Sequence, residues 1–260
     1  MLVLSSMFSN AIKEISKFTR PILFVSRLNS DKLIPGSATL FFINEEGYAL
    51  TCKHVVTSII NVANASNKAI FKFNGCYNHV SDIKIIMHPT YDIAIIKFNG
   101  DTPLYEGHAY FKKDDNVSPG KFLVRSGFAF PEFNNYKIDI KTDKLLFTNE
   151  GNQNTPLFSN EGMVSRLVGN ENMVVGIELS TPGIKGTSGG PLFDEFGLIY
   201  GVQSLSKQYH LGFDIVEEST LINGEYKHVS NYPFIALGEC VSANVIKSFL
   251  KENNIKYYEK

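Results

Sequence analysis

The sequence predicts an all-β protein, arranged either as barrels or as a sandwich. Three observations support this prediction: apolar runs of strand length recur along the chain, turn residues separate them, and segments with helical periodicity are few. Many short strands at close spacing are typical of barrels and sandwiches. The 260 residues, 43% of them hydrophobic, suffice for one large domain or two small lobes with a substantial core.

The expected strands fall into two series. The first consists of apolar runs at 22–25, 38–43, 70–73, 83–87 and 93–98. The second consists of "KFLVRSGFAF", "KLLFTNEG", "MVSRLVG", "MVVGIEL", "PLFDEFGLIYGVQS" and "YPFIALGECV". The polar, turn-rich stretch "KKDDNVSPG" at 112–120 separates the series, so we expect it to link two lobes.

Helix is expected in three places only. A short amphipathic segment lies near residues 7–17, and "HVVTSIINVA" after Lys53 suits two or three turns. Near the end, "SANVIKSFLKENN" has the pattern of a helix capped by Ser242 or Asn244. Its apolar face indicates packing against the core rather than a partner site.

Charge and hydropathy narrow the classes of partner. Lys and Arg number 25 against 26 for Asp and Glu, so the net charge of -1 gives no electrostatic reason to expect nucleic acid or an anionic membrane as a partner. No segment approaches the roughly 20 apolar residues of a membrane span. The N-terminal sequence lacks the early positive charge and the cleavage site of a signal peptide. We therefore expect a soluble protein of the cytoplasm.

The three cysteines agree with a reducing compartment. Cys52, Cys76 and Cys240 are an odd number, lie far apart and match no C-x-x-C spacing for zinc or redox chemistry. Buried free thiols are expected. The sequence predicts no metal site and no cofactor.

The stretch "GTSGGPL" at 186–192 contains a Gly-x-Ser-x-Gly match centred on Ser188. This pattern occurs on unrelated folds. In an α/β-hydrolase the serine lies between a strand and a helix, but here two glycines, a proline and a hairpin pattern follow it. Histidines at 210 and 228 also follow it, so the esterase alternative is disfavoured by context without being excluded.

The chain order histidine, aspartate, serine fits better. His54 ends the apolar hairpin "GSATLFFINEEGYALTCKHVV", and Asp92 precedes a strand in "HPTYDIAIIKF", 38 residues later. Ser188 follows after another 96 residues. A serine nucleophile needs a base to take its proton, and the base needs a carboxylate to orient it. Each residue alone would be an ordinary structural residue, but together they indicate a catalytic triad.

In these three motifs, and in the ending "ALGECVSANVIKSFLKE", the sequence resembles the trypsin/chymotrypsin-like serine peptidases of the PA clan over roughly residues 21–252. It is most similar to their bacterial HtrA-like and glutamyl-endopeptidase-like branch. The resemblance implies two six-stranded antiparallel β-barrels with the site in the cleft between them. It divides the chain into an N-terminal segment 1–20, a first barrel lobe 21–117, a second barrel lobe 118–241, and a C-terminal helix and tail 242–260.

The resemblance also implies roles for further residues. The amides of Gly186 and Ser188 would form the oxyanion hole. Substrate would bind between the loop before the nucleophile and the edge of the strand "GVQSLS". The residues that would line this pocket are Pro182, Ile184, Gln203, Ser204, Leu205 and Ser206. They predict a small or medium, mostly apolar residue before the scissile bond, and the absence of an acidic residue disfavours Lys or Arg there.

The function implied is a serine endopeptidase that acts on protein or peptide substrates through an acyl-enzyme intermediate, with narrow specificity or activation by a protein partner. Thr187 stands where secreted digestive members carry an aspartate that pairs with a new N-terminal amine, so no zymogen cleavage is expected. No PDZ-like extension follows the C-terminal helix. Two long segments, 131–161 and 207–231, could carry specificity or regulation. The alternative is a catalytically silent binding module on the same fold.

Overall fold

The computed structural model contains three helices and nineteen strands within the part of the chain that it describes. The helices are α1 (Ser9–Phe18), α2 (Lys53–Ser66) and α3 (Ala243–Glu252). The described residues are 8–27, 33–66, 70–73, 76–79, 83–99, 105–114, 116–130, 136–139, 144–147, 156–170, 173–213, 215–222, 224–231 and 234–260. The mostly-β class with a C-terminal helix is confirmed.

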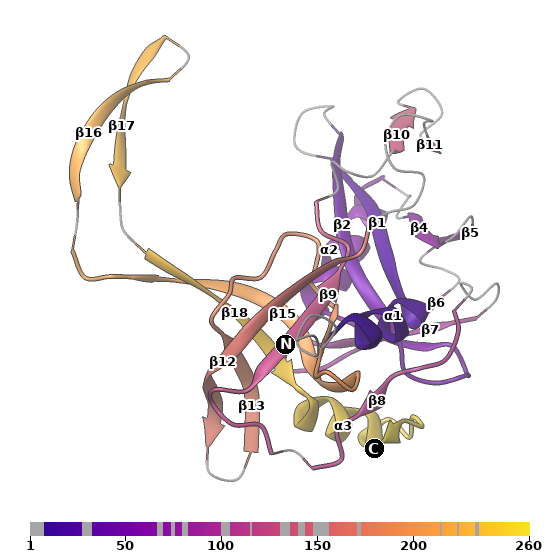
Figure 1. The fold of residues 1–260 in the computed structure, drawn as a ribbon. Coiled ribbons are helices and arrows are strands. Elements are labelled where there is room, and N and C mark those ends of the chain that lie inside the picture. The colour runs from indigo at the N-terminus through magenta and orange to yellow at the C-terminus, as the bar shows by residue number, and fades with distance from the viewer. Residues whose placement is uncertain are drawn as a thin grey trace.

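The first lobe is built on a five-stranded antiparallel sheet (Figure 1). Its spatial order is β1-β2-β3-β7-β6, from strands β1 (Thr19–Arg27), β2 (Leu33–Phe42), β3 (Tyr48–Thr51), β6 (Ile83–Met87) and β7 (Ala94–Phe98). Apolar side chains on both sides of the turn at 44–47, such as Phe42 and Leu50, are fully buried. A separate hairpin is formed by β4 (Ile70–Phe73) and β5 (Cys76–His79).

The second lobe is an eight-stranded sheet with the order β14-β9-β12-β13-β18-β15-β8-β19. Its strands are β8 (Tyr110–Phe111), β9 (Phe122–Gly127), β12 (Phe158–Asn170), β13 (Met173–Leu179), β14 (Pro191–Phe193), β15 (Leu198–His210), β18 (Phe234–Ser242) and β19 (Tyr258–Glu259). β14 also pairs with β15, which closes six antiparallel strands into a ring. In the first lobe, the described strand pairings do not close the sheet into a barrel. The prediction of two six-stranded barrels therefore stays a prediction.

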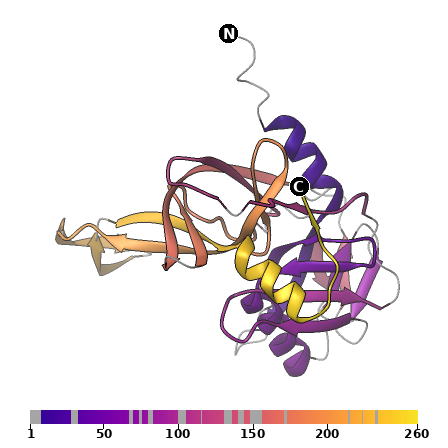
Figure 2. The same cartoon turned by 90° about the horizontal axis from the view of Figure 1, so that it is seen from below.

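One hydrophobic cluster joins the lobes and the C-terminal helix. It includes Ile95 of the first sheet, Phe193 and Ile199 of the second, and Ile246 of α3. Figure 2 shows α3 lying against the junction of the two lobes. Ser242 caps this helix, since its hydroxyl accepts a hydrogen bond from the N–H of Asn244 at 3.1 Å. The predicted cap and the predicted core-facing side of the helix are therefore both confirmed.

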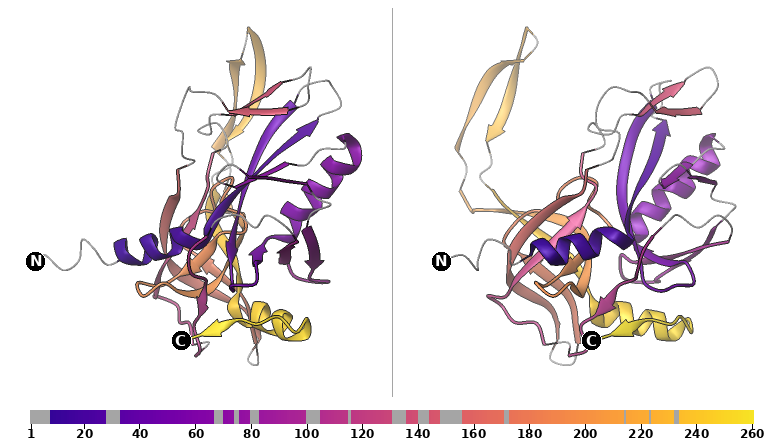
Figure 3. Two further views of the ribbon diagram at one scale, coloured as in Figure 1. Left: turned by 90° about the vertical axis from the view of Figure 1, so that its right-hand side faces the viewer. Right: turned by 45° about the vertical axis from the view of Figure 1, so that its right-hand side comes forward.

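The second of the two long segments forms an arm. β16 (Ile215–Ile222) and β17 (Glu225–Asn231) pair only with each other in the described chain and extend away from both lobes (Figures 1 and 3). The pairing of β15 with β18 leads into this arm and reaches His210 and Phe234. The first long segment contains the hairpin of β10 (Tyr136–Asp139) and β11 (Lys144–Phe147) and the start of β12.

Two of the three cysteines are free and buried, as expected: Cys52 and Cys240. The side chain of Cys76 lies outside the described part of the structure. Among the described residues, none of the helices has the length and apolar character needed to cross a membrane.

Candidate active site

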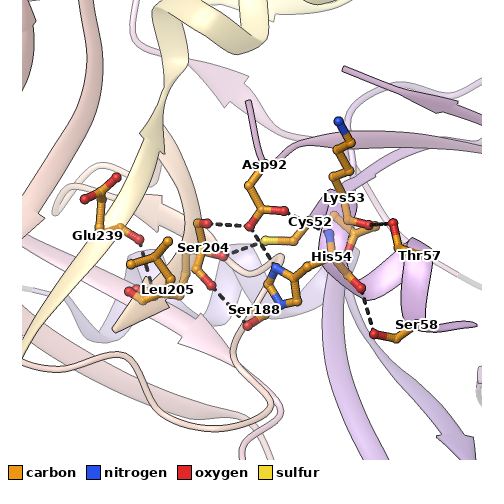
Figure 4. Close-up of polar contacts among 12 residues, drawn as sticks. Cys52, Lys53, His54, Thr57, Ser58, Asp92, Ser188, Ser204, Leu205 and Glu239 are labelled. Atoms are coloured by element: carbon orange, nitrogen blue, oxygen red, sulfur yellow. Dashed lines mark hydrogen bonds and ion pairs between the residues drawn. The ribbon is translucent and has the colours of Figure 1, made fainter. Parts of the chain in front are cut away.

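His54 and Asp92 are brought together by the pairing of two strands in the first sheet. His54 is the second residue of α2, which begins directly after β3, and Asp92 lies in the loop before β7. Thr51 at the end of β3 lies opposite Ala94 at the start of β7. The side chains therefore meet at the same end of these two paired strands. Nδ1 of His54 lies 2.7 Å from Oδ2 of Asp92 (Figure 4).

The backbone of the helix strengthens this contact. The N–H of His54 donates to Oδ1 of Asp92 at 2.9 Å. The first N–H groups of a helix have no partner within the helix, so the carboxylate caps α2 while it holds the imidazole. Both carboxylate oxygens of Asp92 thus bind one residue, which fixes the orientation of His54.

Asp92 remains ionised throughout the neutral range. Burial favours its neutral form, but hydrogen bonds from the imidazole of His54, the hydroxyl of Ser204 and the N–H of His54 outweigh this effect and lower its pKa to about 2. An ionised carboxylate only accepts hydrogen bonds. Nδ1 of His54 must therefore carry a proton, which leaves Nε2 as the nitrogen that can accept one.

Ser188 reaches the site from the other lobe. It lies in the loop 180–190 between β13 and β14, and its carbonyl accepts from the N–H of Thr39 in β2 at 2.9 Å. Its hydroxyl donates to the carbonyl of Ser204 at 3.2 Å, and the hydroxyl of Ser204 donates to Oδ2 of Asp92 at 2.5 Å. The three predicted triad residues are therefore joined through Ser204, and the Ser188 hydroxyl bonds to that residue rather than to His54 (Figure 4).

Gly186 occupies a backbone conformation that other residues rarely adopt. Its φ is +98°, and a Cβ atom there would lie 2.5 Å from Oγ of Ser37 and overlap the carbonyl of Phe128. The conformation and the space both require glycine.

Between residues 186 and 190 of this loop, two amide groups have no acceptor in the described part of the chain. The N–H groups of Thr187, Gly189 and Gly190 donate to carbonyls of Ile184, Gln203 and Thr187. In the described part of the chain, the N–H groups of Gly186 and Ser188 have no such partner.

The direction of the first of these amides follows from its own peptide unit. The carbonyl of Lys185 accepts from the N–H of Phe130 at 3.0 Å. The C=O and N–H of a trans peptide point in opposite directions, so the N–H of Gly186 points away from Phe130. Two free donors on one rigid loop can stabilise a developing oxyanion.

The residues predicted to line the substrate pocket separate into two groups. Pro182, Leu205 and Ser206 are exposed and Ile184 is half-buried, so these four are accessible at the surface. Ser204 is buried, and its hydroxyl binds Asp92, a contact that the sequence did not indicate. Gln203 is buried, and its side-chain oxygen accepts from Nη1 of Arg125 at 2.8 Å.

Two buried residues near the site were not singled out from the sequence. Thr39 donates from Oγ1 to the carbonyl of Gly186 at 2.9 Å. Arg125 binds the segment before the nucleophile, with Nη2 3.1 Å from the carbonyl of Pro182. A lone arginine within the apolar run "KFLVRSGFAF" was the available signal for the second.

Cys52, His54 and Asp92 are the one described group whose donor atoms are close enough to hold a metal ion together, within 4.8 Å of one another. The donor set does not favour one. Burial raises the pKa of the Cys52 thiol well above its usual value, whereas a metal ligand must be a thiolate. The thiol instead donates to the carbonyl of Gln203 at 3.0 Å.

The fold and this geometry agree with the comparison to known families. The chain belongs to the trypsin-like peptidase domain family, whose model matches residues 37–202. The matched range contains His54, Asp92 and Ser188. Family membership indicates a serine protease.

A solved structure shows the same fold. An HtrA-type protease, AlgW, solved with a tripeptide, is similar with a TM-score of 0.56 at 13% sequence identity. The similarity covers 94% of this chain and 62% of that one, so the chain spans less than two thirds of the length of AlgW. A search of curated proteins gave no match.

Proposed function

We propose that the protein is a serine endopeptidase in which Ser188 is the nucleophile, His54 the general base and Asp92 the group that orients it. The observation that carries the proposal is the ionised Asp92 bound to Nδ1 of His54, beside a serine whose loop presents two unpaired amides. Peptidase family membership makes protein or peptide the substrate class.

The geometry supports hydrolysis in two stages. Oγ of Ser188 forms a bond to the carbonyl carbon of the scissile peptide while its proton passes to Nε2 of His54. The oxyanion accepts hydrogen bonds from the amides of Gly186 and Ser188. The carbon–nitrogen bond then breaks, the amine leaves with the proton from His54, and an ester remains on Ser188.

In the second stage water attacks the ester. It gives one proton to Nε2 of His54 and forms a bond to the acyl carbon. The new oxyanion uses the same two amides. When it collapses, the oxygen of Ser188 leaves, recovers the proton from His54, and the product is released as a carboxylic acid.

The Ser188 hydroxyl must turn before this can happen. It now donates to the carbonyl of Ser204, so rotation about its Cα–Cβ bond has to bring Oγ to Nε2 of His54. Nucleophile and base are often apart until substrate is bound. We propose that substrate aligns them, with its backbone along residues 204–206 at the edge of β15 and its side chain near Pro182 and Ile184.

The same hydroxyl orientation favours one alternative, a catalytically silent binding module on this fold. Labelling with a fluorophosphonate probe, which reacts with activated serines, separates the two functions. We expect a single adduct on Ser188 by intact mass and peptide mapping, and none in Ser188→Ala. Absence of an adduct on folded wild-type protein, both purified and in cell lysate, would favour the silent module.

We further propose a cytoplasmic enzyme of narrow specificity or one that a protein partner activates. The free thiols of Cys52 and Cys240 support a reducing compartment. Restricted activity predicts slow digestion of unfolded casein by the isolated protein. Rapid digestion without a partner would contradict this restriction while leaving the peptidase function intact.

A further inference from the structure

Arg125 is a cation enclosed in the second lobe. It lies in β9, and only 2% of its surface is exposed. Nη1 donates to the side-chain oxygen of Gln203 at 2.8 Å, and Nη2 donates to the carbonyls of Thr181 at 3.0 Å and Pro182 at 3.1 Å and to the hydroxyl of Thr181 at 2.5 Å. Nε is buried and has no acceptor among the described residues. The guanidinium therefore meets only neutral oxygens.

No carboxylate in the described part of the chain forms an ion pair with Arg125. Gly238 contacts the guanidinium, because a Cβ atom there would overlap Nη1. Neighbouring residues of a strand point to opposite faces, so the side chain of Glu239 points away from Arg125. Glu239 forms an ion pair with Lys207. Glu178 lies opposite Glu239 in the strand pairing and forms an ion pair with Arg166. The acidic groups of this region are thus bound on the other face of the sheet.

A buried charge without a counter-ion is costly, because a guanidinium does not lose its proton and neutral dipoles replace its hydration only in part. Burial lowers the pKa of Arg125, and no carboxylate offsets this effect. Structural arginines are normally paired when they are this deeply buried. The positive charge of Arg125 is therefore balanced only by neutral hydrogen-bond acceptors among the described residues.

The position of Arg125 links it to the nucleophile. The N–H of Gly189, next to Ser188, donates to the carbonyl of Gln203 at 2.8 Å, and the side chain of the same Gln203 accepts from Arg125. Pro182, which also accepts from Arg125, lies in the loop that carries Ser188, four residues before Gly186. A Cβ atom at Gly183 would lie 2.6 Å from Nε2 of Gln203. The backbones of Gly183 and Gly238 thus pack directly against the polar ends of Gln203 and Arg125.

We propose that Arg125 makes this peptidase selective for an acidic side chain, Glu or Asp, on the substrate residue that precedes the scissile bond. The inference rests on the proposed function and on the assignment of Pro182 and Gln203 to the substrate pocket. It replaces the sequence expectation of a small apolar residue at that position.

The chemistry of the guanidinium supports this selectivity. A carboxylate accepts two parallel, charge-assisted hydrogen bonds from arginine, and it neutralises the buried charge. It reaches the guanidinium by replacing the carbonyl of Pro182, the longest of the four contacts, and uses the unpaired Nε–H. Lys185, exposed on the loop between Pro182 and Ser188, adds positive charge at the approach. A basic substrate side chain is repelled, and an apolar one leaves the cation unpaired.

The test compares peptides that differ only in the residue before the scissile bond: Glu, Gln, Leu and Lys. Cleavage by the wild-type protein gives kcat/KM, and binding to Ser188→Ala of peptides ending at that residue gives Kd. We expect Glu to exceed Gln at least tenfold in both measurements, with Lys the poorest. Equal values for Glu and Gln would overturn the proposal.

Two variants test the role of Arg125 itself. Arg125→Met removes the charge, and we expect it to abolish the preference for Glu over Gln; Arg125→Lys keeps the charge and should retain part of it. A preference for Glu that persists in Arg125→Met would overturn the proposal. If Arg125→Met fails to fold, two measurements still test the proposal. They are the ratio of kcat/KM for the Glu and Gln peptides in the wild type and the change of that ratio in Arg125→Lys.

The labelling and binding measurements distinguish failure of the proposed peptidase function from failure of the proposed acidic selectivity. Fluorophosphonate labelling of Ser188 together with equal use of Glu and Gln peptides would refute the acidic preference alone. Preferential binding of Glu peptides without any labelling would refute the peptidase function and leave the selectivity of Arg125 for an acidic side chain in place.

Discussion

The hydroxyl group of Thr39 ties the first lobe to the loop 180–190 of the second, which carries Gly186 and Ser188. It donates to the carbonyl of Gly186 at 2.9 Å and accepts from the N–H of Phe128 at 2.9 Å. Thr39 is fully buried in β2, so water cannot replace either partner. The carbonyl of Gly186 is thus held from the opposite lobe, and the conformation of the loop depends on how the lobes are joined.

Replacing Thr39 by valine tests this dependence. Thr39→Val keeps the shape of the side chain but leaves the carbonyl of Gly186 and the N–H of Phe128 unpaired. We expect the free energy of unfolding to fall by about 1–3 kcal/mol and kcat to fall more than KM rises. Thr57→Val, which removes an exposed hydroxyl bound to Lys53 in α2, is the matched control and should change little. Equal effects of the two changes would contradict the role of Thr39.

Asp92→Asn tests the electrostatic part of the triad. Asparagine is nearly isosteric, but it can donate to Nδ1 of His54 and so favours the wrong tautomer. We expect kcat to fall by about 10⁴ with little change in KM, because Nε2 then carries a proton and cannot accept the one from Ser188. Fluorophosphonate labelling of Ser188 should slow in parallel. Labelling at the wild-type rate would show that Asp92 does not activate this serine.

The low pKa of Asp92 predicts how stability depends on pH. Its pKa is about 2 in the folded protein and about 3.9 in an unfolded chain, so its ionisation stabilises the fold above about pH 4. This contribution is lost as the pH falls toward 2. In urea unfolding between pH 6 and pH 2.5, the wild type should lose more stability than Asp92→Asn. Other carboxylates with lowered pKa values, such as Glu178, titrate in both proteins and cancel in the difference.

Gly186→Ala tests the oxyanion loop. The φ of +98° and the overlap of a Cβ with the carbonyl of Phe128 force the loop to move. We expect labelling of Ser188 and kcat to fall by about 10² or more, the effect of losing one oxyanion donor. Gly120→Ala is the matched control, because its φ is +91° but nothing lies within 4 Å of the added Cβ. If both variants keep full activity, the amide of Gly186 has no catalytic role.

The arm can be removed without unfolding the lobes. In the described chain its strands β16 and β17 pair only with each other, and isolated two-stranded hairpins contribute little stability. We expect a variant in which Asn-Gly replaces residues 211–233, joining His210 to Phe234, to melt within about 3 °C of the wild type. Differential scanning calorimetry would measure this. A drop above about 10 °C would show that the arm supports the lobes.

Sequence patterns singled out the three residues of the proposed triad because each lies in a motif of its own. His54 ends an apolar hairpin, Asp92 precedes a strand and Ser188 lies between glycines, and their order limited the choice of family. The structure brings the three into one hydrogen-bond network. The C-terminal helix and its Ser242 cap were equally local features.

The residues and contacts that the sequence did not indicate depend on distant segments of the chain. Thr39 lies 147 positions from Gly186, and Arg125 lies 78 from Gln203. Periodicity shows which face of a strand is buried but not which strand lies opposite. For the same reason the sequence did not indicate that the hydroxyl of Ser204 contacts Asp92 across the interface of the lobes, while its place beside substrate stays a prediction.

The thiol of Cys52 affects how inhibitor profiles of this protein should be interpreted. It lies within 4.8 Å of the functional atoms of His54 and Asp92 and is completely enclosed. An alkylating reagent that enters during a transient opening adds bulk beneath the carboxylate and displaces it from the imidazole. Inactivation by iodoacetamide would therefore not identify a cysteine peptidase. Cys52→Ala should remain active and become resistant to that reagent, which distinguishes steric damage from loss of a nucleophile.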